Sequence, residues 1–271
     1  MAESLRVNPW AVVETLCRRE LVRFFRQRNR VIGALGQPLL FWLLFSAGLG
    51  PSFRMPGSGE GASIGFGEYF FPGTVVLIVL FTSIFATISI IEDRREGFLQ
   101  SVLVAPIPRW SMVLGKLLGG TLIAMIQALL FLVLGLFIGL RFGPLELLSI
   151  TALLFALSLA LTGLGFIIAW RLDSTQGFHA VMSLFLMPMW LLSGAFFPST
   201  SGVLHWITLI NPLSYGVAGL RQLLYWNVGQ TPHLQHLPSL AICWGVTLLF
   251  AALMFAASCR ISAQRTSGDL L

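Results

Sequence analysis

Six long stretches of almost continuous apolar residues dominate the chain, and each is long enough to cross a membrane. A spanning helix needs about 20 apolar residues, because each residue rises about 1.5 Å and the hydrocarbon core is about 30 Å thick. The stretches cover residues 31–50, 70–91, 117–140, 147–170, 178–198 and 238–258. They are continuous rather than alternating, which argues against a transmembrane barrel. The pattern predicts an all-α integral membrane protein with six transmembrane helices.

The composition agrees with this prediction. Apolar residues make up 56% of the chain and charged residues only 10%, whereas about 25% of the residues of a soluble protein are charged. A soluble domain would lack the polar residues that its surface needs. A disordered chain would be poor in apolar residues and rich in charge. Both classes are therefore excluded.

The uneven distribution of basic residues predicts an orientation. The chain has 17 Lys+Arg and 11 Asp+Glu. With six spans, 14 of the 17 basic residues lie on one side, and basic residues gather on the cytoplasmic side. We therefore expect both termini to be cytoplasmic and take the excess as an orientation signal, not as a nucleic-acid surface. A cleaved signal peptide is a weaker alternative, because the first apolar stretch follows a long basic segment.

Residues 1–30 are predicted to form a separate cytoplasmic helix that lies on the membrane. Asn8 suits an N-cap and Pro9 the first helical position. Apolar residues follow at spacings of three or four, and arginines lie largely off this stripe, as in helices that bind anionic lipid. A solvated basic leader remains the alternative. The stripe consists of Trp10, Val13, Cys17, Leu21 and Phe24.

The loop at 92–116 is predicted to contain a short helix that docks on a partner. Five consecutive charges at 92–96 precede Gly97, and an apolar segment at 98–104 is long enough for two helical turns. Pro106 and Pro108 then end the helix. Phe98 and Leu99 are costly to leave in water, so a docking surface is favoured over an ordinary solvated loop.

The segment 199–237 is predicted to form short outer helices before the last span. Asn211 and Pro212 divide it into two apolar pieces, each too short to cross the membrane, and Tyr215 and Arg221 lie in the second piece. These pieces would re-enter or lie on the outer leaflet, with aromatic rings at the interface. The alternative is a seventh span at 203–226, which would bury Arg221 in the bilayer and place the tail outside.

Several kinds of chemistry are absent or weakly indicated. No predicted span has Asp, Glu, Lys or Arg in its interior, which disfavours ion-coupled carriers and channels, and Gln127 is the clearest interior polar residue. No phosphate-binding GxxxxGK[ST] loop and no GxSxG motif occurs.

His233 and His236 could share a metal, with His205 nearby, but no carboxylate is close. Gly135 and Gly139 form a GxxxG pair that suits helix packing or dimerisation. The three cysteines, Cys17, Cys243 and Cys259, form no CxxC pair and are interpreted as idle thiols.

Taken together, these features resemble the permease subunits of the type-2 ABC exporter family (ABC-2 type transporters). The residues that carry the resemblance span nearly the whole chain. They are Phe71-Pro72-Gly73, the charged turn from Arg94 to Leu99, the LVAPIP run at 103–108, Gly115-Lys116, Gly119-Gly120, the SGAFFP run at 193–198, the NPLSY run at 211–215 and Leu220-Arg221.

The resemblance implies an exporter that works with a separate ATPase subunit. That subunit would bind ATP and magnesium, so this chain would be neither an enzyme nor a cofactor-binding protein. Contacts with the ATPase would come from Arg94, Arg95, Glu96, Gly97, Phe98 and Leu99. Residues 31–258 would form the transmembrane domain and residues 259–271 a cytoplasmic tail.

The resemblance also implies a location, an assembly and a broad substrate class. The location is the plasma (inner) membrane, and the assembly a homodimer or a pair with a related permease. The cargo would be a drug, a lipid or a lipid-linked polysaccharide moved out of the cytoplasm or inner leaflet. An ion-coupled carrier and a non-transporting assembly protein are the alternatives.

Overall fold

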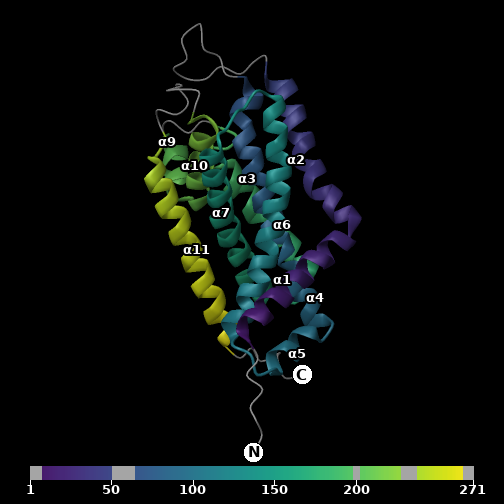
Figure 1. The fold of residues 1–271 in the computed structure, drawn as a ribbon. Helices are drawn as coiled ribbons and strands as arrows, with labels where there is room; N and C mark the ends of the chain where they lie inside the picture. Colours follow the sequence, from purple (N-terminus) through teal and green to yellow (C-terminus); the bar gives the residue numbers. More distant parts are fainter. Residues whose placement is uncertain (1–7, 51–64, 198–201, 227–236, 265–271) are drawn as a thin grey trace, which may run out of the picture.

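The fold is a bundle of long helices, shown in Figure 1. The computed structural model describes residues 8–50, 65–197, 202–226 and 237–264, and among them the regular elements are helices, with no strand. The all-α prediction is therefore confirmed for these residues. The helices are α1 (Pro9–Arg26), α2 (Arg28–Leu49), α3 (Phe66–Ala86), α4 (Ile88–Arg95), α5 (Phe98–Val104), α6 (Arg109–Phe137), α7 (Pro144–Arg171), α8 (Thr175–Leu191), α9 (Gly202–Ile210), α10 (Pro212–Leu224) and α11 (Leu240–Ala263).

Five candidate membrane spans are present among the described residues. They are Val31–Leu49, Phe66–Arg95, Arg109–Phe137, Pro144–Arg171 and Leu240–Ala263. The predicted fifth span at 178–198 corresponds to α8, which ends earlier than expected, at Leu191, and has 17 residues. A helix of that length rises about 25 Å, short of the roughly 30 Å hydrocarbon core. The count of six predicted spans is thus supported for five.

The second predicted span is interrupted near its end. α3 and α4 follow one another directly, but the chain leaves regular helical bonding at Thr87, whose hydroxyl donates to the Ile84 carbonyl at 2.6 Å. A side-chain bond of this kind competes with the helical bonds and often bends a helix. Gly165 of α7 lies opposite, where an added Cβ would lie 2.8 Å from the Thr87 hydroxyl. The break therefore lies where α3 and α7 approach closely.

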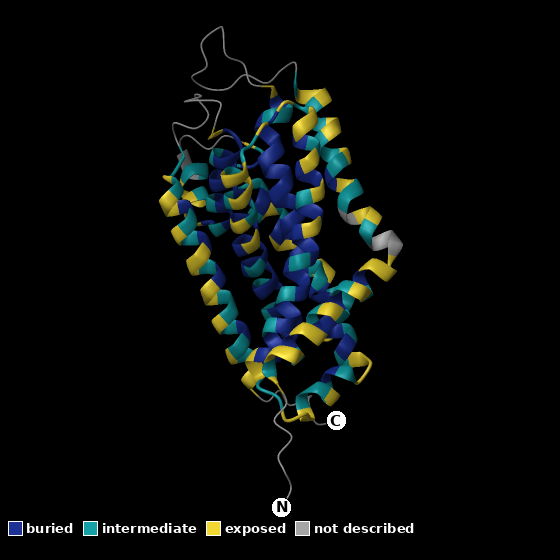
Figure 2. Ribbon diagram, viewed as in Figure 1, coloured by how far each residue is buried: buried dark blue, intermediate teal, exposed yellow. Residues whose placement is uncertain are grey.

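The core lies along α3, with α6 and α7 beside it. In the most apolar part of the α3–α4 span 89% of the residues are buried, whereas the corresponding shares for α2 and α11 are 6% and 17%. Figure 2 shows the same contrast, with dark blue helices in the middle and yellow and teal on the outer ones. Exposed apolar side chains on outer helices suit contact with lipid. The pattern is that of a membrane bundle with one buried central helix.

The two ends of the bundle differ. α1, α4 and α5 gather at one end, together with the last turn of α11, and we call this the α5 end (Figure 1). α9 and α10 lie near the opposite end, which we call the α10 end. The short helices α9 and α10 are separated at Asn211, so the alternative of one continuous seventh span is wrong. The predicted pair of short helices before the last span is present.

Candidate functional site

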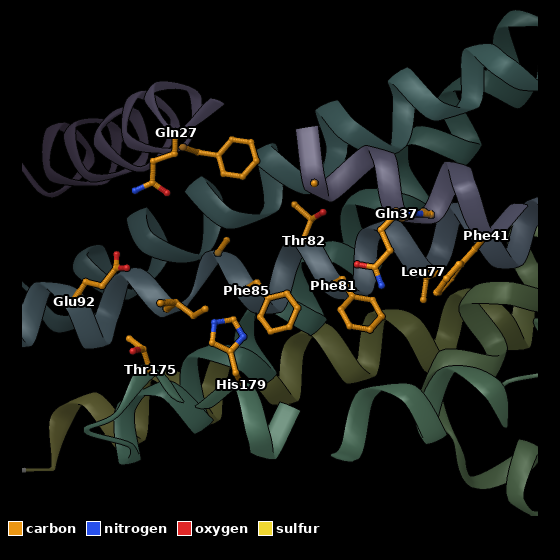
Figure 3. Close-up of a pocket in the computed structure, with 15 residues that line it drawn as sticks. Gln27, Gln37, Phe41, Leu77, Phe81, Thr82, Phe85, Glu92, Thr175 and His179 are labelled. Carbon is orange, nitrogen blue, oxygen red and sulfur yellow. The ribbon is translucent and has the colours of Figure 1, made fainter. Parts of the chain in front are cut away.

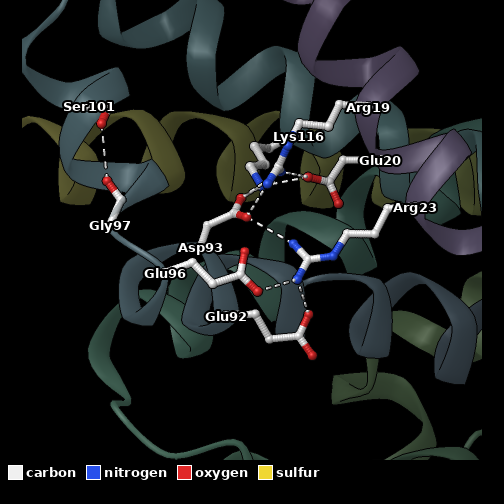
Figure 4. Close-up of polar contacts among 9 residues, drawn as sticks. All are labelled: Arg19, Glu20, Arg23, Glu92, Asp93, Glu96, Gly97, Ser101 and Lys116. Atoms are coloured by element: carbon white, nitrogen blue, oxygen red, sulfur yellow. Dashed lines mark hydrogen bonds and ion pairs between the residues drawn. The ribbon is translucent and has the colours of Figure 1, made fainter.

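A buried network of charged side chains joins α1, α4 and α6 at the α5 end (Figure 4). At its centre the Asp93 carboxylate is 0% exposed and is paired with Lys116 of α6 and with Arg19 and Arg23 of α1. The Arg19 and Arg23 guanidinium groups lie 2.6 and 2.8 Å from Asp93 Oδ1. One carboxylate therefore ties two helices to the end of a third.

Three further carboxylates complete this charge network. Lys116 Nζ also donates to Glu20 Oε1 of α1 at 2.5 Å, and the Lys116 side chain is only 4% exposed. Arg23 lies 2.8 Å from Glu92 and 3.3 Å from Glu96. Buried charges are stable only when they are paired and hydrogen-bonded. The network consists of three cations and four carboxylates, each with an ion-pair partner, and Glu92 Oε2 is held by the Arg23 ion pair without a hydrogen bond. Its members are Arg19, Glu20, Arg23, Glu92, Asp93, Glu96 and Lys116.

α1 reaches this position because α6 presents glycines to it. A Cβ at Gly119 would lie 2.6 Å from the Glu20 Cβ, and one at Gly115 would lie 2.9 Å from the Leu16 Cβ. Close approach between helices is the usual role of small residues four apart. Burial, with the Glu20 charge adding to it, raises the pKa of the neighbouring Cys17 thiol.

A tight turn connects α5 to α4, the helix that contributes Asp93 to the charge network. Gly97 has a φ of 76°, in the left-handed region that glycine adopts at no steric cost. Leu99 on the next turn is only 2% exposed, and the Phe98 ring lies 3.8 Å below the Arg19 guanidinium carbon. Val104 at the far end of α5 is 86% exposed. One side of α5 is thus packed on the bundle and its tip is free.

A second set of contacts fixes the start of α5 to the turn between α7 and α8. The Arg94 guanidinium donates to the Asp173 carboxylate at 2.9 Å and to the Trp170 carbonyl at 2.7 Å. Arg95 donates to the Asp173 carbonyl at 2.8 Å. The helix end that carries α5 is therefore attached to the α7–α8 turn as well as to α1 and α6.

A cavity of about 460 Å³ lies between α2, α3 and α8, and the end of α1 contributes to its wall (Figure 3). This volume is in the range of sites that bind small molecules. The wall combines four phenylalanine rings with the polar side chains of Gln27, Gln37, Thr82, Glu92, Thr175 and His179. Thr82 also donates to Gln127 Oε1 of α6 at 2.7 Å, so the polar residue expected inside the third span supports the cavity wall.

A polar clamp holds the α10 end together. Pro72 in α3 leaves the Glu68 carbonyl without its helical donor, and the Tyr225 hydroxyl donates to that carbonyl at 2.6 Å. Burial raises the pKa of Tyr225, and the nearby Glu68 charge adds to the effect. Arg221 is 3% exposed and donates to the carbonyls of Tyr69 at 3.3 Å and Gly194 at 3.2 Å.

The clamp also brings two sequence motifs into contact. A Cβ at Gly73 would lie 2.8 Å from the Ala195 Cβ, and Trp190 Nε1 donates to the Gly73 carbonyl at 2.9 Å. Gly194 takes a φ of 76° at the turn that presents its carbonyl to Arg221. The FPG and SGAFFP runs, far apart in the sequence, thus form one packed corner.

The family comparison decides what kind of protein this arrangement belongs to. Residues 11–225 match the family described as ABC-2 type transporter. This chain belongs to the ABC-2 type transporter family. The match covers the bundle from α1 through α10, including the charge network, the cavity and the clamp.

Three relatives agree with the family assignment of this permease. A protein of Cyanophora paradoxa named as a transport permease, ycf38, is 27% identical over 214 residues, which are 76% of this chain and 71% of the relative. Its namesake in Pyropia yezoensis is 27% identical over 235 residues, 79% of this chain and 75% of the relative. A protein of Escherichia coli K12 named as a multidrug ABC transporter permease, YbhR, is 29% identical over 147 residues, which are 52% of this chain and 38% of the relative.

Membership of the ABC-2 family confirms several predictions. The protein is a multi-pass membrane permease and not an enzyme, and nucleotide is bound by a separate ATPase subunit. An ATPase is therefore a partner of this permease. The alternatives of an ion-coupled carrier and of an assembly protein do not describe an ABC-2 permease.

The residues expected to contact the ATPase fall into two groups in the permease. Arg95, Glu96 and Gly97 are exposed at the turn before α5. Phe98 and Leu99 pack inward, and Arg94 is bonded to the α7–α8 turn. The sequence did not distinguish the exposed from the packed residues of this segment, because all of them belong to one short charged and apolar run.

The stripe expected on the N-terminal helix is rotated in the structure. Val13 and Phe24, which were expected to face lipid, are buried within the bundle instead, and Cys17 and Leu21 are half-buried. Trp10 is 64% exposed, with its ring 5.5 Å from that of Trp110. Leu16 and Glu20 complete the buried face instead. The arginines that were expected to lie off the stripe turn partly inward, because Asp93 and Glu92 face them from α4.

The outer residues are found in the clamp or beside it. Asn211 caps α10 by accepting from the Leu213 amide at 3.0 Å, and its own amide donates to the Met189 carbonyl at 2.6 Å. Pro212 begins α10, and the Tyr215 hydroxyl donates to the Leu209 carbonyl at 2.9 Å. Arg221 lies inside the clamp. His233 and His236 lie outside the described residues, and the described residues contain no group of metal ligands.

Sequence reasoning missed Glu20, Asp93 and Lys116 as one buried unit. A signal was present, because Glu20 follows Leu16 and precedes Phe24 at helical spacing on the apolar face. A carboxylate in such a stripe indicates a buried cation on a neighbouring helix. Which cation it pairs with depends on how α1 packs on α6.

Proposed function

We propose that this permease is the membrane-spanning part of an ATP-driven exporter, and that α5 is the element on which its ATPase docks. The observation that carries the proposal is the charge network, which joins α4, the helix that leads into α5, to α1 and α6 through buried ion pairs. Paired buried charges resist separation. A push on α5 by the ATPase would therefore move α1, α4 and the start of α6 together.

The docking surface of α5 would consist of its exposed residues. Arg95, Glu96 and Gly97 at the preceding turn are exposed, as are Ser101 and Val104 on the helix itself. The other residues that the resemblance implies would hold α5 in position on the bundle. They are Arg94, which is bonded to Trp170, and Phe98 and Leu99, which pack inward. An apolar tip flanked by charges suits a groove on a soluble partner.

The orientation that fits this function places the α5 end in the cytoplasm. Arginines of α1 and α4 and the last residue of α7, Arg171, collect there, as the positive-inside pattern requires. α1 would lie against the inner leaflet, since Trp10, Val22 and Phe25 on its outer side are exposed and apolar. Both chain termini would then be cytoplasmic, in the plasma (inner) membrane.

The transported molecule would be hydrophobic or amphipathic. Support comes from the cavity, which opens within the membrane part of the bundle and is lined mainly by apolar side chains. The E. coli relative is named for multidrug transport, and a drug-sized molecule fits the cavity volume. Lipid and lipid-linked polysaccharide are the other classes that the family resemblance implies.

A second copy of the permease would complete the transport path. α8 exposes Leu184 and Phe185, and α2 exposes Leu40, Leu43 and Leu44, beside the cavity wall that these helices form. A homodimer, or a pair with a related permease, would enclose the cavity between two such faces and leave an outward path along the interface.

The docking claim is tested with the permease purified together with its ATPase in lipid nanodiscs. Val104→Asp should abolish co-purification of the ATPase and the ATP hydrolysis that depends on the complex, because it places a charge on the exposed tip of α5. Leu145→Asp is the matched control, since Leu145 is also an exposed apolar residue but lies in the first turn of α7, whereas it is the last turn of α7 that is bonded to Arg94 at the α5 end. Full, stimulated hydrolysis in Val104→Asp and in Phe98→Asp would overturn the proposal.

A further inference from the structure

We propose that the cavity between α2, α3 and α8 selects amphipathic cations, with Glu92 as the residue that recognises their positive charge. This inference rests on the proposed function, because it names the substrate class of the proposed transport path. The charge of the cavity wall is the first observation. Among the described residues that line the cavity, Glu92 has a carboxylate and none is a lysine or an arginine.

The phenylalanine rings of the wall suit the same ligand. Phe24, Phe41, Phe81 and Phe85 come from α1, α2 and α3 and contribute to one cavity. The face of an aromatic ring attracts a cation, and the attraction grows when water is excluded. Rings of this kind bind apolar groups of any charge, but together with one carboxylate they favour a cation over an anion of the same shape.

The carboxylate lies toward one end of the cavity. Figure 3 shows Glu92, Gln27 and Thr175 toward that end, which we call the polar end, and Phe41, Leu77 and Gln37 toward the other, with Phe85 between them. An amphipathic cation matches this arrangement when its charge lies near Glu92 and its apolar body lies against the rings. The polar end adjoins α4 and therefore the α5 end of the bundle.

Arg23 does not cancel the charge of Glu92. Its guanidinium is shared among Glu92 at 2.8 Å, Asp93 at 2.8 Å and Glu96 at 3.3 Å. Within the charge network the carboxylates outnumber the cations by one, and the neighbouring Arg94 and Arg95 are bonded to Trp170 and Asp173 instead. A ligand cation can approach Glu92 while Arg23 keeps its two other partners.

The experiment measures binding of two probes that match in size and differ in charge. The permease in lipid nanodiscs is titrated with radiolabelled tetraphenylphosphonium, and separately with tetraphenylborate, by equilibrium dialysis against empty nanodiscs. We expect saturable binding of the cation and no saturable binding of the anion. The neutral triphenylphosphine oxide should bind more weakly than the cation. Equal binding of cation and anion would overturn the proposal.

Two variants assign the selectivity to Glu92. Glu92→Gln should raise the Kd for tetraphenylphosphonium on the order of tenfold, since it removes the carboxylate charge and keeps the shape. Glu14→Gln is the matched control, because Glu14 is an exposed carboxylate of α1 that belongs neither to the charge network nor to the cavity lining, and its Kd should stay unchanged. An equal effect of both variants, or none of Glu92→Gln, would contradict the role of Glu92.

The readouts keep this inference separate from the proposed function. Gel filtration and melting of each variant show whether it is folded, and Glu92→Asp, which keeps the charge, should bind nearly as the original does. If Glu92→Gln did not fold, the comparison of the two probes on the unaltered permease would still decide the selectivity. Selective binding without any effect on ATP hydrolysis would overturn the transport role alone. ATPase coupling without selective binding would overturn the cation site alone.

Discussion

At the scale of single residues, Asp93 is the most deeply buried member of the charge network at the α5 end. Its carboxylate is fully buried and accepts from three cations, two on α1 and one on α6. Removing one partner from a buried ion pair costs about 3–5 kcal/mol, because the other charge is left without compensation. The contrast is with exposed pairs, whose contribution is about 0–1 kcal/mol.

We therefore expect Asp93→Asn to lower the apparent melting temperature of the purified permease on the order of 10 °C. Asn keeps the shape but offers no charge to Lys116, Arg19 or Arg23. The measurement is a thermal melt in detergent. Asp173→Asn makes the same chemical change at a side chain that is 91% exposed, and it should shift the melt little although it removes the Arg94 pair.

A double variant checks that the loss comes from the ion pairs. Lys116→Met together with Asp93→Asn removes a buried cation as well as its carboxylate, so the pair should be less destabilised than the sum of the two single variants. Additive losses would indicate that Asp93 and Lys116 act independently, contrary to their direct contact.

Glu20 and Arg221 are two residues whose contacts could not be predicted from the sequence. Arg221 was expected in an outer segment, and its burial depends on the carbonyls of Tyr69 and Gly194, which come from two other parts of the chain. Glu20 lay visibly within an apolar stripe, but its partner Lys116 is 96 residues away. The residue types indicated that charged groups are present. Which groups pair with each other depends on how the helices pack, and the periodicity of the sequence does not specify that packing.

At the scale of elements, the contact between α1 and α6 depends on glycines that leave room for a neighbouring helix. The closest approach is at Gly119, opposite the Cβ of Glu20. Because Cβ is fixed to the backbone, a clash there can be relieved only by a shift of a helix, not by a change of rotamer. The position of α1, and with it that of Arg19 and Arg23, follows from this small residue.

Gly119→Ala should accordingly loosen α1 and destabilise the permease by about 1–3 kcal/mol through overpacking. Gly245→Ala on α11 is the control, since nothing lies within 4 Å of a Cβ there. It should be neutral or stabilise the helix by up to about 1 kcal/mol. Hydrogen exchange of the α1 amides should rise in the first variant and stay unchanged in the second. Unchanged exchange in both would mean that Gly119 does not position α1.

Long helices were predictable and their interruptions were not. The apolar runs gave α2, α6, α7 and α11 because lipid imposes length and composition on a spanning helix. The break at Thr87 arises from a side-chain hydrogen bond and from the approach of Gly165, neither of which changes the apolar run. The early end of α8 at Leu191 precedes the turn at Gly194, where the SGAFFP run packs on α3.

At the scale of the whole molecule, the α5 end and the α10 end are held by different chemistry. Ion pairs join α1, α4 and α6 at the α5 end, whereas carbonyl groups accept from Arg221 and Tyr225 at the α10 end. The cavity lies between α2, α3 and α8, with Glu92 of the charge network in its wall. Movement of the charge network by an ATPase would therefore change the polar end of the cavity first.

The proposed orientation requires α8 to cross the membrane despite its 17 residues. An even number of crossings brings the ends of α1 and α11 to one side, as both lie at the α5 end in Figure 1. A hydrophobic helix shorter than the bilayer is accommodated by local thinning, at a modest cost. Alkaline phosphatase, which is active only outside the cytoplasm, should be inactive when fused after Asp173 and active when fused after Phe197. A fluorescent protein fused to the C-terminus should fluoresce. Inactive phosphatase at both positions would show that α8 does not cross and that five helices span the membrane.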